Sequence, residues 1–405
     1  MGSPAALTVF DALVFLAVAI PFALLVRHRH AIPALPDTRD AGPPAALSVV
    51  IPARDEGATI GRAVASLLSQ DYPKLEVIAV DDRSTDSTAE QLREIARSDG
   101  RLAVISVTEL PPGWLGKNHA LSIGAARASG AWLLFSDADV VFAPRMLARA
   151  VAYAEREGLD HLTIAPLLVA RGLLLRGFVA FFAYAFVALW GAYLANDPKS
   201  RRGVGIGAFN LMRREAYEAI GGMRPLSLRP DDDIRLGRRL RAFGFRQRVV
   251  NGRDALSVEW YASLGGALSG LEKSLYASAE YRPTDAALVI AFLLATMVWP
   301  FAGFVILAGV DRVLLGSAAA LLLIGLAETY RQAMGPLGTG ALVTIALLPF
   351  SALCFAYALA RSAVLAERRG VSWRGTLYPL SLLRSQSGLE GSPRADRATG
   401  RGNAL

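Results

Sequence analysis

Apolar runs of membrane length lie at both ends of this chain, and they constrain its fold more than any other feature. Residues 7–26 form a nearly continuous apolar run, and further runs occupy 286–310, 313–327 and 339–360. About 20 predominantly apolar residues are enough to cross a bilayer as a helix. The composition agrees, because 19% of the residues are charged, against about 25% in average soluble domains. We therefore expect an integral membrane protein.

The charges around the first run indicate an uncleaved anchor. Residues 1–6 contain no Lys or Arg, whereas the run is followed directly by Arg and His at 27–30. A secretory signal has the opposite polarity, with basic residues before the apolar stretch. Residues 1–30 are therefore predicted to anchor the chain, with the C-terminal end of the helix in the cytoplasm.

The C-terminal runs, within residues 286–360, are expected to form about three transmembrane helices. The middle run, 313–327, is short and fits a tilted hairpin partner. Three spans would place the Arg-rich tail, 361–405, on the side opposite a cytoplasmic domain, against the positive-inside tendency. The number of spans therefore stays open, and the tail is expected to be partly disordered.

The central stretch, residues 45–284, has the pattern of one soluble α/β domain of roughly 240 residues, a normal domain size. Short β-branched runs such as 47–51 and 75–80 alternate with helical patterns such as 58–69. Alternation of this kind predicts a mostly parallel sheet covered by helices. The segment 172–195 is apolar apart from one arginine, which is costly near mid-bilayer, so an interfacial helix is favoured over a span or a buried helix.

The single cysteine, Cys354, excludes a disulfide framework and a multi-cysteine metal site. The net charge of +8 would suit nucleic acid. However, the basic residues are scattered and flank apolar runs, without the basic stripe that a nucleic-acid surface needs. We therefore expect no nucleic-acid partner.

Three acidic motifs lie where predicted strands end or a helix begins. Asp81 and Asp82 close the second strand, at the edge where open α/β sheets bind ligands, although a helix cap just after them is the simpler alternative. Two carboxylates spaced like Asp137 and Asp139 can jointly hold a hard divalent cation, or they can merely form a polar loop. The third motif, residues 231–233, suits either a helix N-terminus or a general base whose pKa is raised by like charges.

Two further features suggest substrate contacts. The Gly-rich stretch 203–207 lacks the third glycine of a dinucleotide fingerprint, so a flexible loop that lets a substrate approach closely is the better interpretation. Lys117 lies on a loop before the helix that leads to Asp137. It suits a phosphate contact, with a solvated lysine as the default alternative.

Taken in order, these motifs resemble the family 2 glycosyltransferases with the nucleotide-sugar-binding fold called GT-A. The resemblance rests on Val49–Glu56 (VVIPARDE), Val80–Asp86 (VDDRSTD), Phe135–Asp139 (FSDAD), Gly205–Gly222 and Asp231–Leu240. It implies an α/β domain with a mostly parallel sheet, flanked here by one N-terminal and about three C-terminal transmembrane helices. The membrane implied is a bacterial-type inner or plasma membrane, with the catalytic domain cytoplasmic.

The resemblance also implies a donor site. Asp81, Asp82, Lys117 and Asp137 would bind a nucleotide-sugar donor, with uridine diphosphate sugars the commonest in the family. Asp137 and Asp139 would hold a divalent cation, Mn²⁺ or Mg²⁺, at the diphosphate.

On the acceptor side, the resemblance implies Asp233 as the general base, with Asp232 beside it in the third motif. Gly205, Gly207 and Phe209 would lie near the acceptor. The reaction implied is transfer of the sugar to an acceptor hydroxyl with inversion at the anomeric carbon.

One departure from the family bears on the acceptor. Processive polysaccharide synthases carry a Gln-x-x-Arg-Trp motif beyond the third acid, and Ser269–Tyr276 stands there instead. The overall plan is similar to the ceramide-glucosyltransferase-like and hopene-associated branches, which implies a membrane lipid acceptor. The alternatives are an enzyme of polysaccharide synthesis and a non-catalytic membrane protein that binds nucleotide sugars.

Overall fold

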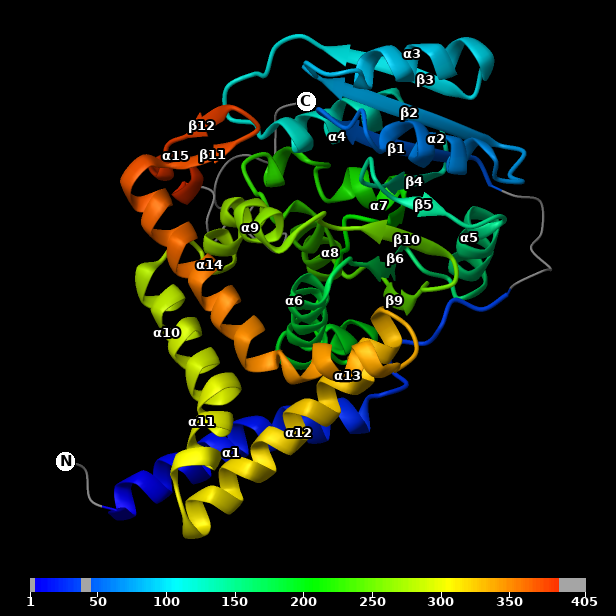
Figure 1. Cartoon of the computed structure of the whole chain (residues 1–405). Helices are drawn as coiled ribbons and strands as arrows, with labels where there is room; N and C mark the ends of the chain where they lie inside the picture. Colours follow the sequence, from blue (N-terminus) through cyan, green and yellow to red (C-terminus); the bar gives the residue numbers. More distant parts are fainter. Residues whose placement is uncertain (1–3, 38–44, 386–405) are drawn as a thin grey trace. The chain divides into compact units, whose positions relative to one another are not determined.

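The computed structural model describes residues 4–37 and 45–385. Most of the tail that the sequence predicts to be partly disordered therefore lies outside the described residues. The chain divides into two compact units (Figure 1). The sheet unit is built from Ile32–Leu167, Leu194–Glu259 and, among the described residues, 381–385, and the helical unit from Met1–Ala31, Leu168–Tyr193 and Trp260–Leu380.

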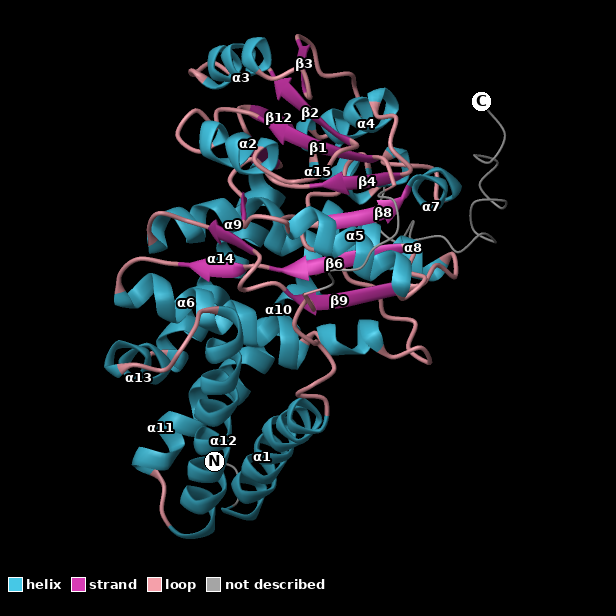
Figure 2. Cartoon of the chain, turned by 90° about the vertical axis from the view of Figure 1, so that its right-hand side faces the viewer, coloured by secondary structure: helices cyan, strands magenta, loops and turns pink. Residues whose placement is uncertain are grey.

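A seven-stranded sheet forms the centre of the sheet unit, with its strands side by side in the order β3-β2-β1-β4-β8-β6-β9 (Figure 2). Strand β8 runs antiparallel to its neighbours β4 and β6, and the other pairs are parallel. The prediction of a mostly parallel sheet is therefore confirmed. The strand bounds are β1 Leu47–Ala53, β2 Leu75–Asp82, β3 Leu102–Val107, β4 Trp132–Phe135, β6 His161–Ala165, β8 Asn210–Arg213 and β9 Gln247–Asn251.

The helices of the sheet unit bury one apolar face each. In the first of them the buried residues are Ile60, Ala63, Val64 and Leu67, the spacing of one face of a helix. Three others share a core with the sheet that includes Val50, Leu133 and Leu240. The helix bounds are α2 Ile60–Leu68, α3 Thr88–Ser98, α4 Gly116–Arg127, α5 Met146–Arg156, α7 Arg214–Ala219 and α8 Asp232–Ala242, with short turns at η2 Ala192–Asn196 and η3 Arg224–Leu226.

Register places the acidic motifs at one edge of this sheet. Ala53 of β1 pairs with Asp81 of β2, and Val50 of β1 pairs with Phe135 of β4, two residues before Asp137. Because β1, β2 and β4 are parallel, their carboxyl ends share an edge. Just beyond it, β5 (Val141–Phe142) pairs antiparallel with β10 (Leu256–Glu259).

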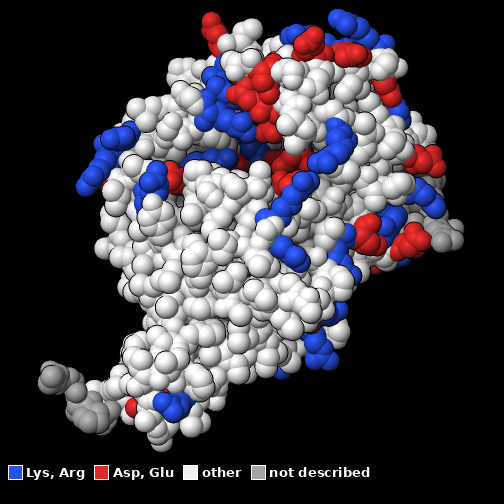
Figure 3. All heavy atoms as spheres, in the orientation of Figure 1, with Lys and Arg blue, Asp and Glu red and all other residues white. Residues whose placement is uncertain are grey.

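Four helices of the helical unit are long and apolar enough to cross a membrane. One is N-terminal, Ala5–Arg27, and three are C-terminal, Pro283–Ile306, Gly309–Ala333 and Leu348–Arg369. The predicted arrangement of one N-terminal and three C-terminal helices is confirmed. Figure 3 shows broad uncharged areas over this unit, whereas charged side chains gather over the sheet unit.

The remaining elements of the helical unit connect and pack against these spans. The core includes Phe181, Leu322 and Leu348. The bounds are α1 Pro4–Arg27, α6 Leu173–Tyr184, η1 Ala185–Leu189, α9 Leu264–Ser278, α10 Pro283–Leu293, η4 Leu294–Val298, α11 Trp299–Ile306, α12 Gly309–Ala333, α13 Thr339–Ala346, α14 Leu348–Arg369, β11 Val371–Trp373 and β12 Thr376–Tyr378, with β7 Leu167–Val169 and α15 Leu380–Arg384 at the boundaries of the units.

Two of the C-terminal runs differ from their predicted extents. The middle run, expected to be a short hairpin partner, is part of a 25-residue helix, α12, whose charged residues lie in the terminal turns. The run predicted at 339–360 is divided between α13 and α14. Pro349 stands in the first turn of α14, and a proline there favours the start of a new helix over the continuation of the previous one. The interfacial position of residues 172–195 stays a prediction.

Candidate active site

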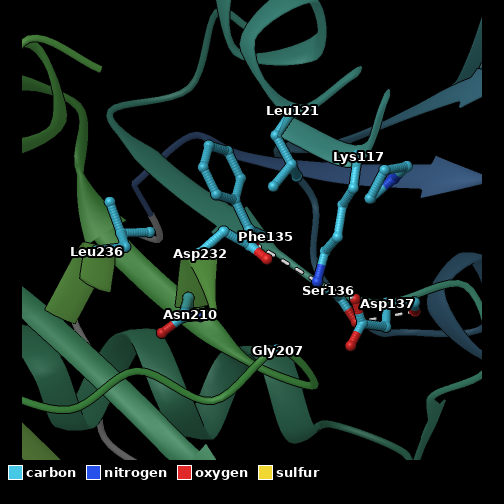
Figure 4. A pocket seen from close by; sticks show the side chains of 10 residues that line it. Lys117, Leu121, Phe135, Ser136, Asp137, Gly207, Asn210, Asp232 and Leu236 are labelled. Carbon is cyan, nitrogen blue, oxygen red and sulfur yellow. Dashed lines mark hydrogen bonds and ion pairs between the residues drawn. The ribbon is translucent and has the colours of Figure 1, made fainter. Parts of the chain in front are cut away.

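A small, open pocket lies at the carboxyl edge of the sheet, between the first turns of α4 and α8. Figure 4 shows Lys117 entering it from α4 toward Asp137 and Asp232. The lining residues are Pro52, Lys117, Leu121, Phe135, Ser136, Asp137, Gly207, Asn210, Asp232 and Leu236. The structure therefore brings residues of the second and third acidic motifs together around one lysine.

Lys117 links those two motifs by ion pairs. Its Nζ lies 2.8 Å from Oδ1 of Asp137 and 3.5 Å from Oδ2 of Asp232. Burial opposes the charge of the ammonium, but Asp137, Asp232 and Asp233 outweigh it, so the pKa of Lys117 is raised above its ordinary value. A solvated surface lysine is thereby excluded, and the pocket holds a fixed positive charge.

The three consecutive aspartates at 231–233 have different environments. Asp231 is buried and accepts hydrogen bonds from Nε of Arg229, at 2.9 Å, and from Nε of Arg235, at 2.7 Å. Burial alone would raise its pKa, but the two guanidinium groups hold the pKa of Asp231 below its ordinary value. This residue stays ionised and ties the start of α8 to the preceding loop.

Asp232 and Asp233 have the opposite tendency. Burial, with Asp233 and Asp137 nearby, raises the pKa of Asp232 to about 7, although Lys117 opposes the shift. Burial also raises the pKa of Asp233, while Lys117 and two backbone N–H groups oppose it. Those groups are the N–H of Gly207 and of Ile234, each donating to one carboxylate oxygen of Asp233 at 2.7 Å. Asp233 is thus an oriented, half-buried carboxylate whose pKa is raised.

Asp137 and Asp139 follow β4, and both side chains are partly exposed. Burial, together with the charges of Asp137 and Glu56, raises the pKa of Asp139 to about 7. Across residues 4–37 and 45–385, no group of three His, Cys, Asp or Glu side chains is arranged to hold a metal ion. Two carboxylates nevertheless fit a cation that takes its other ligands from phosphate oxygens and water, as Mg²⁺ commonly does.

Asp81 and Asp82, at the end of β2, are both buried. Asp82 pairs with Nε of Arg83 at 2.7 Å and lies 3.7 Å from Nη1 of Arg54. Oδ1 of Asp81 accepts a hydrogen bond from the N–H of Ser84 at 3.3 Å. Neither side chain lines the pocket. In the turn that follows, Asp86 accepts a hydrogen bond from the N–H of Thr88 at 3.0 Å. The side chain that holds the turn before α3 is therefore that of Asp86.

The Gly-rich loop packs against α8. A Cβ on Gly205 would lie 1.9 Å from the backbone O of Asp233, and one on Gly207 would lie 2.5 Å from Oδ2 of Asp137. The missing Cβ of Gly205 therefore lets the loop pack closely against the α8 backbone. Only Gly207 of the three residues assigned to the acceptor side lines the pocket, because Phe209 is fully buried, with its ring centroid 6.3 Å from that of Phe142.

Sequence reasoning missed Asn118, which is fully buried in α4 beside Lys117. Its Nδ2 donates to the carbonyl O of Leu226 at 2.6 Å and to that of Arg229 at 2.9 Å. This amide holds the loop before α8 against α4. The pattern contains no signal for such a contact, because the partners lie more than 100 residues apart and are backbone atoms.

Comparisons with known proteins agree with this geometry. Residues 48–221 match the family model described as Glycosyl transferase family 2. The chain is 32% identical over 181 residues to 4,4'-diaponeurosporenoate glycosyltransferase of Staphylococcus aureus strain USA300, covering 44% of this chain and 46% of that protein. The same enzyme of strain MRSA252 is 31% identical over 179 residues, with the same coverage. The match thus spans about half the length of these curated relatives.

Among solved structures, the chain is similar to a mannosyltransferase from Pyrobaculum calidifontis in complex with GDP-Man and Mn²⁺. The TM-score is 0.51 at 21% sequence identity, covering 89% of this chain and 99% of the other. At that identity the likeness concerns the fold. Residues 48–221 of this chain are therefore similar to a family 2 glycosyltransferase domain, and the fold is the GT-A-like one that the order of the acidic motifs predicted.

Proposed function

We propose that this protein is an inverting glycosyltransferase that moves a sugar from a nucleoside diphosphate donor to a hydroxyl group of a membrane lipid, with Asp233 as the general base. The observation that carries the proposal is the orientation of Asp233. Both of its oxygens are held by backbone N–H groups at 2.7 Å, beside the Lys117–Asp137 ion pair. Asp233 does not itself line the pocket, but its neighbour Asp232 and its hydrogen-bond donor Gly207 do. A carboxylate fixed in this way beside a pocket is suited to accept a proton.

In the proposed reaction the acceptor oxygen attacks the anomeric carbon from the face opposite the leaving group. The new C–O bond forms as the bond between that carbon and the diphosphate oxygen breaks. The hydroxyl proton passes to Asp233, whose pKa burial raises. The products are the glycosylated lipid with inverted configuration and a nucleoside diphosphate.

The donor would lie on the Lys117 side of the pocket. The ammonium of Lys117 can bind diphosphate oxygens, and Asp81 and Asp82, at the end of β2, are proposed for the nucleoside end of the donor. Asp137 and Asp139 would hold a divalent cation, Mn²⁺ or Mg²⁺, which when bound stabilises negative charge on the departing diphosphate. The complex of the mannosyltransferase with GDP-Man and Mn²⁺ supports a nucleotide sugar and a divalent cation for this fold.

Two observations support a lipid acceptor. Four helices have membrane length, and the relative with 32% identity is named for 4,4'-diaponeurosporenoate as the substrate that it glycosylates. The catalytic unit is proposed to face the cytoplasm, since the basic residues at 27–30 follow the first helix. We propose that the lipid reaches the enzyme along the apolar segment 172–195, and that Gly207 marks the acceptor side of the pocket.

Two other functions fit less well. A polysaccharide synthase of this family would carry the Gln-x-x-Arg-Trp motif, which Ser269–Tyr276 lacks. A non-catalytic protein that only binds nucleotide sugars would have no need of an oriented Asp233. No observation favours either alternative over the lipid transferase.

The test is transfer of label from a panel of radiolabelled nucleotide sugars, including uridine and guanosine diphosphate sugars, in membranes containing the protein. Reactions run with and without Mn²⁺, and the lipid extracts are separated by chromatography. We expect one donor to label a mobile lipid, and Asp233→Asn to lower that rate by about 10²- to 10⁴-fold, the usual contribution of a general base.

Asp71→Asn, at an exposed aspartate of the same unit, is the matched control and should keep the wild-type rate. Label that remains at the origin as polymer would favour the polysaccharide synthase. Donor binding without transfer by the wild type would favour the non-catalytic protein. Full activity of Asp233→Asn would remove Asp233 as the base.

A further inference from the structure

Three buried polar side chains form a row beneath the Gly203–Gly207 loop, and the proposed mechanism uses none of them as a reacting group. They are His161, Asn210 and Gln247, with 0%, 2% and 5% of their surfaces exposed. Each is the first residue of its strand, β6, β8 or β9, and His161 pairs directly with Gln247 in the sheet register. We call these three residues the polar row.

The hydrogen bonds of the polar row fix the tautomer of His161. Oδ1 of Asn210 can only accept, so Nε2 of His161 donates to it, at 3.2 Å. Nε2 of Gln247 can only donate, so Nδ1 of His161 accepts from it. Burial lowers the pKa of His161 to about 4, which keeps the imidazole neutral at physiological pH. The ring is thus a fixed link between two amides.

The outer atoms of the polar row hold the backbone of the loop. Oε1 of Gln247 accepts from the N–H of Val204 at 2.9 Å, and Nε2 of Gln247 donates to the carbonyl O of Val204 at 2.8 Å. Oδ1 of Asn210 also accepts from the N–H of Ile206, at 3.3 Å, and Oγ1 of Thr163 shares this donor at 3.0 Å. Two residues of the loop are therefore fixed from below, on either side of Gly205.

The next residue of that loop contacts the proposed base. The N–H of Gly207 donates to Oδ2 of Asp233 at 2.7 Å, directly after the Ile206 amide that Asn210 holds. A shift of the loop would move this donor and release one of the two oxygens of the carboxylate. Because Gly205 lies against the α8 backbone with no space for a Cβ, the loop has little other freedom.

We propose that His161 is a positioning residue, which through the polar row sets the place of the Gly207 N–H and so the orientation of the Asp233 carboxylate. This inference rests on the proposed function, in which Asp233 takes the acceptor proton. A histidine that only filled the core would also need hydrogen-bond partners for its ring nitrogens, but those partners would not need to hold the loop. The distinction is measurable, because misplacing a catalytic group by about 1 Å can cost about 10²-fold in rate.

The experiment compares His161→Phe, His161→Gln and the wild type in detergent-solubilised full-length protein. The rate constant kcat and the donor KM are measured separately, and hydrogen–deuterium exchange is followed in the peptide that contains residues 204–207. We expect His161→Phe to lower kcat by about 10- to 100-fold, with a donor KM close to that of the wild type and faster exchange in the loop. His161→Gln should regain most of kcat, because its amide offers a donor toward Asn210 and an acceptor toward Gln247.

Tyr72→Phe is the matched control, since it removes a different buried hydrogen bond of the sheet unit, from Tyr72 Oη to the carbonyl O of Ala45. Its kcat and loop exchange should equal those of the wild type. Gln247→Met keeps the His161 side chain but removes its Gln247 donor and both contacts to Val204, so its kcat and loop exchange test the polar row if His161→Phe does not fold. Wild-type kcat and wild-type loop exchange in a folded His161→Phe protein would overturn the inference.

The exchange measurement keeps the two proposals separate. Wild-type protein that transfers sugar from no donor would refute the proposed function, whatever His161 does. Loop exchange would still report whether the polar row holds residues 204–207, because that readout needs no substrate. An active wild type whose loop is unaffected by His161→Phe would refute the positioning role alone.

Discussion

Two buried polar sites, one in the sheet unit and one in the helical unit, are held in different ways. In the sheet unit, buried charges and amides occur in connected sets, such as Asp231 with its two arginines and the polar row beneath the Gly203–Gly207 loop. In the helical unit, Asp11 is fully buried in α1 and accepts one hydrogen bond, from Nε1 of Trp299 at 2.7 Å. Its other oxygen has no hydrogen-bond partner among the residues that the structure describes.

The difference follows from what each unit must do. A pocket for charged substrates requires side chains fixed to within a fraction of an ångström, and networks in which each member is satisfied provide that rigidity. Helices that cross a bilayer satisfy their backbone internally and associate through close packing, so they need few polar side chains. Polar groups in the sheet unit therefore set geometry, whereas Asp11 makes a single local contact.

Asp231→Asn should break the sheet unit's network with the largest effect on stability. It removes the buried carboxylate that pairs with Arg229 and Arg235, and breaking a buried ion pair typically costs about 3–5 kcal/mol of unfolding free energy. The pKa of Asp231 lies below its ordinary value of 3.8, so its stabilising contribution is present above that pH and is lost as the pH falls through the lowered pKa. The difference in unfolding free energy between the wild type and Asp231→Asn should be largest at pH 7 and should become smaller below about pH 4.

The measurement is denaturant unfolding of the detergent-solubilised protein, followed by tryptophan fluorescence at pH 7 and at pH 3.5. Asp71→Asn, at an exposed position, is the control and should match the wild type at both values. If Asp231→Asn loses the same unfolding free energy relative to the wild type at both pH values, Asp231 acts through packing and its charge makes no contribution.

Gly205→Ala should have the next largest effect. The added Cβ would meet the backbone O of Asp233 at 1.9 Å, and a helix backbone cannot move as cheaply as a flexible side chain. We expect a loss of about 1–3 kcal/mol in unfolding free energy. Because the strain lies beside the proposed base, transfer activity should fall by about 10²-fold.

Gly100→Ala tests the same chemical change in the same unit, where nothing lies within 4 Å of the added atom. Its stability and activity should stay near those of the wild type. Wild-type activity in Gly205→Ala would mean that the loop can move away from α8 without loss of activity. The Gly203–Gly207 loop would then not be held rigidly, as the comparison with the helical unit requires.

Much of the sheet unit was predictable because its signals are local. Asp81 and Asp137 each follow a short apolar strand, and a parallel sheet brings such strand ends to one edge. Membrane-length helices are equally local, since they depend on run length and composition. The break between α13 and α14 was missed because apolar residues continue through it, although Pro349 is a visible reason for a helix to start there.

The different directions of the pKa shifts within residues 231–233 could not be predicted from the sequence. Three adjacent carboxylates look alike in a sequence, and only the folded positions of Arg229 and Arg235 lower the pKa of Asp231 while its neighbours are raised. The polar row has the same origin. His161, Asn210 and Gln247 come from three strands far apart in the chain, and each is an ordinary residue at the start of a strand.

Asp11 offers the smallest expected effect and the sharpest test of the helical unit. Asp11→Leu loses one hydrogen bond, worth on average about 0.6 kcal/mol between transmembrane helices, but also removes the buried oxygen that has no hydrogen-bond partner. Its unfolding free energy should therefore stay within about 1 kcal/mol of the wild type. Trp299→Phe removes only the donor and leaves the whole carboxylate unpaired, so it should cost more than Asp11→Leu. Denaturant unfolding of both variants in the same detergent shows which of them loses more unfolding free energy. If Asp11→Leu is instead the more damaging change, by 2 kcal/mol or so, Asp11 belongs to a polar network comparable to those of the sheet unit, and the contrast between the two units is wrong.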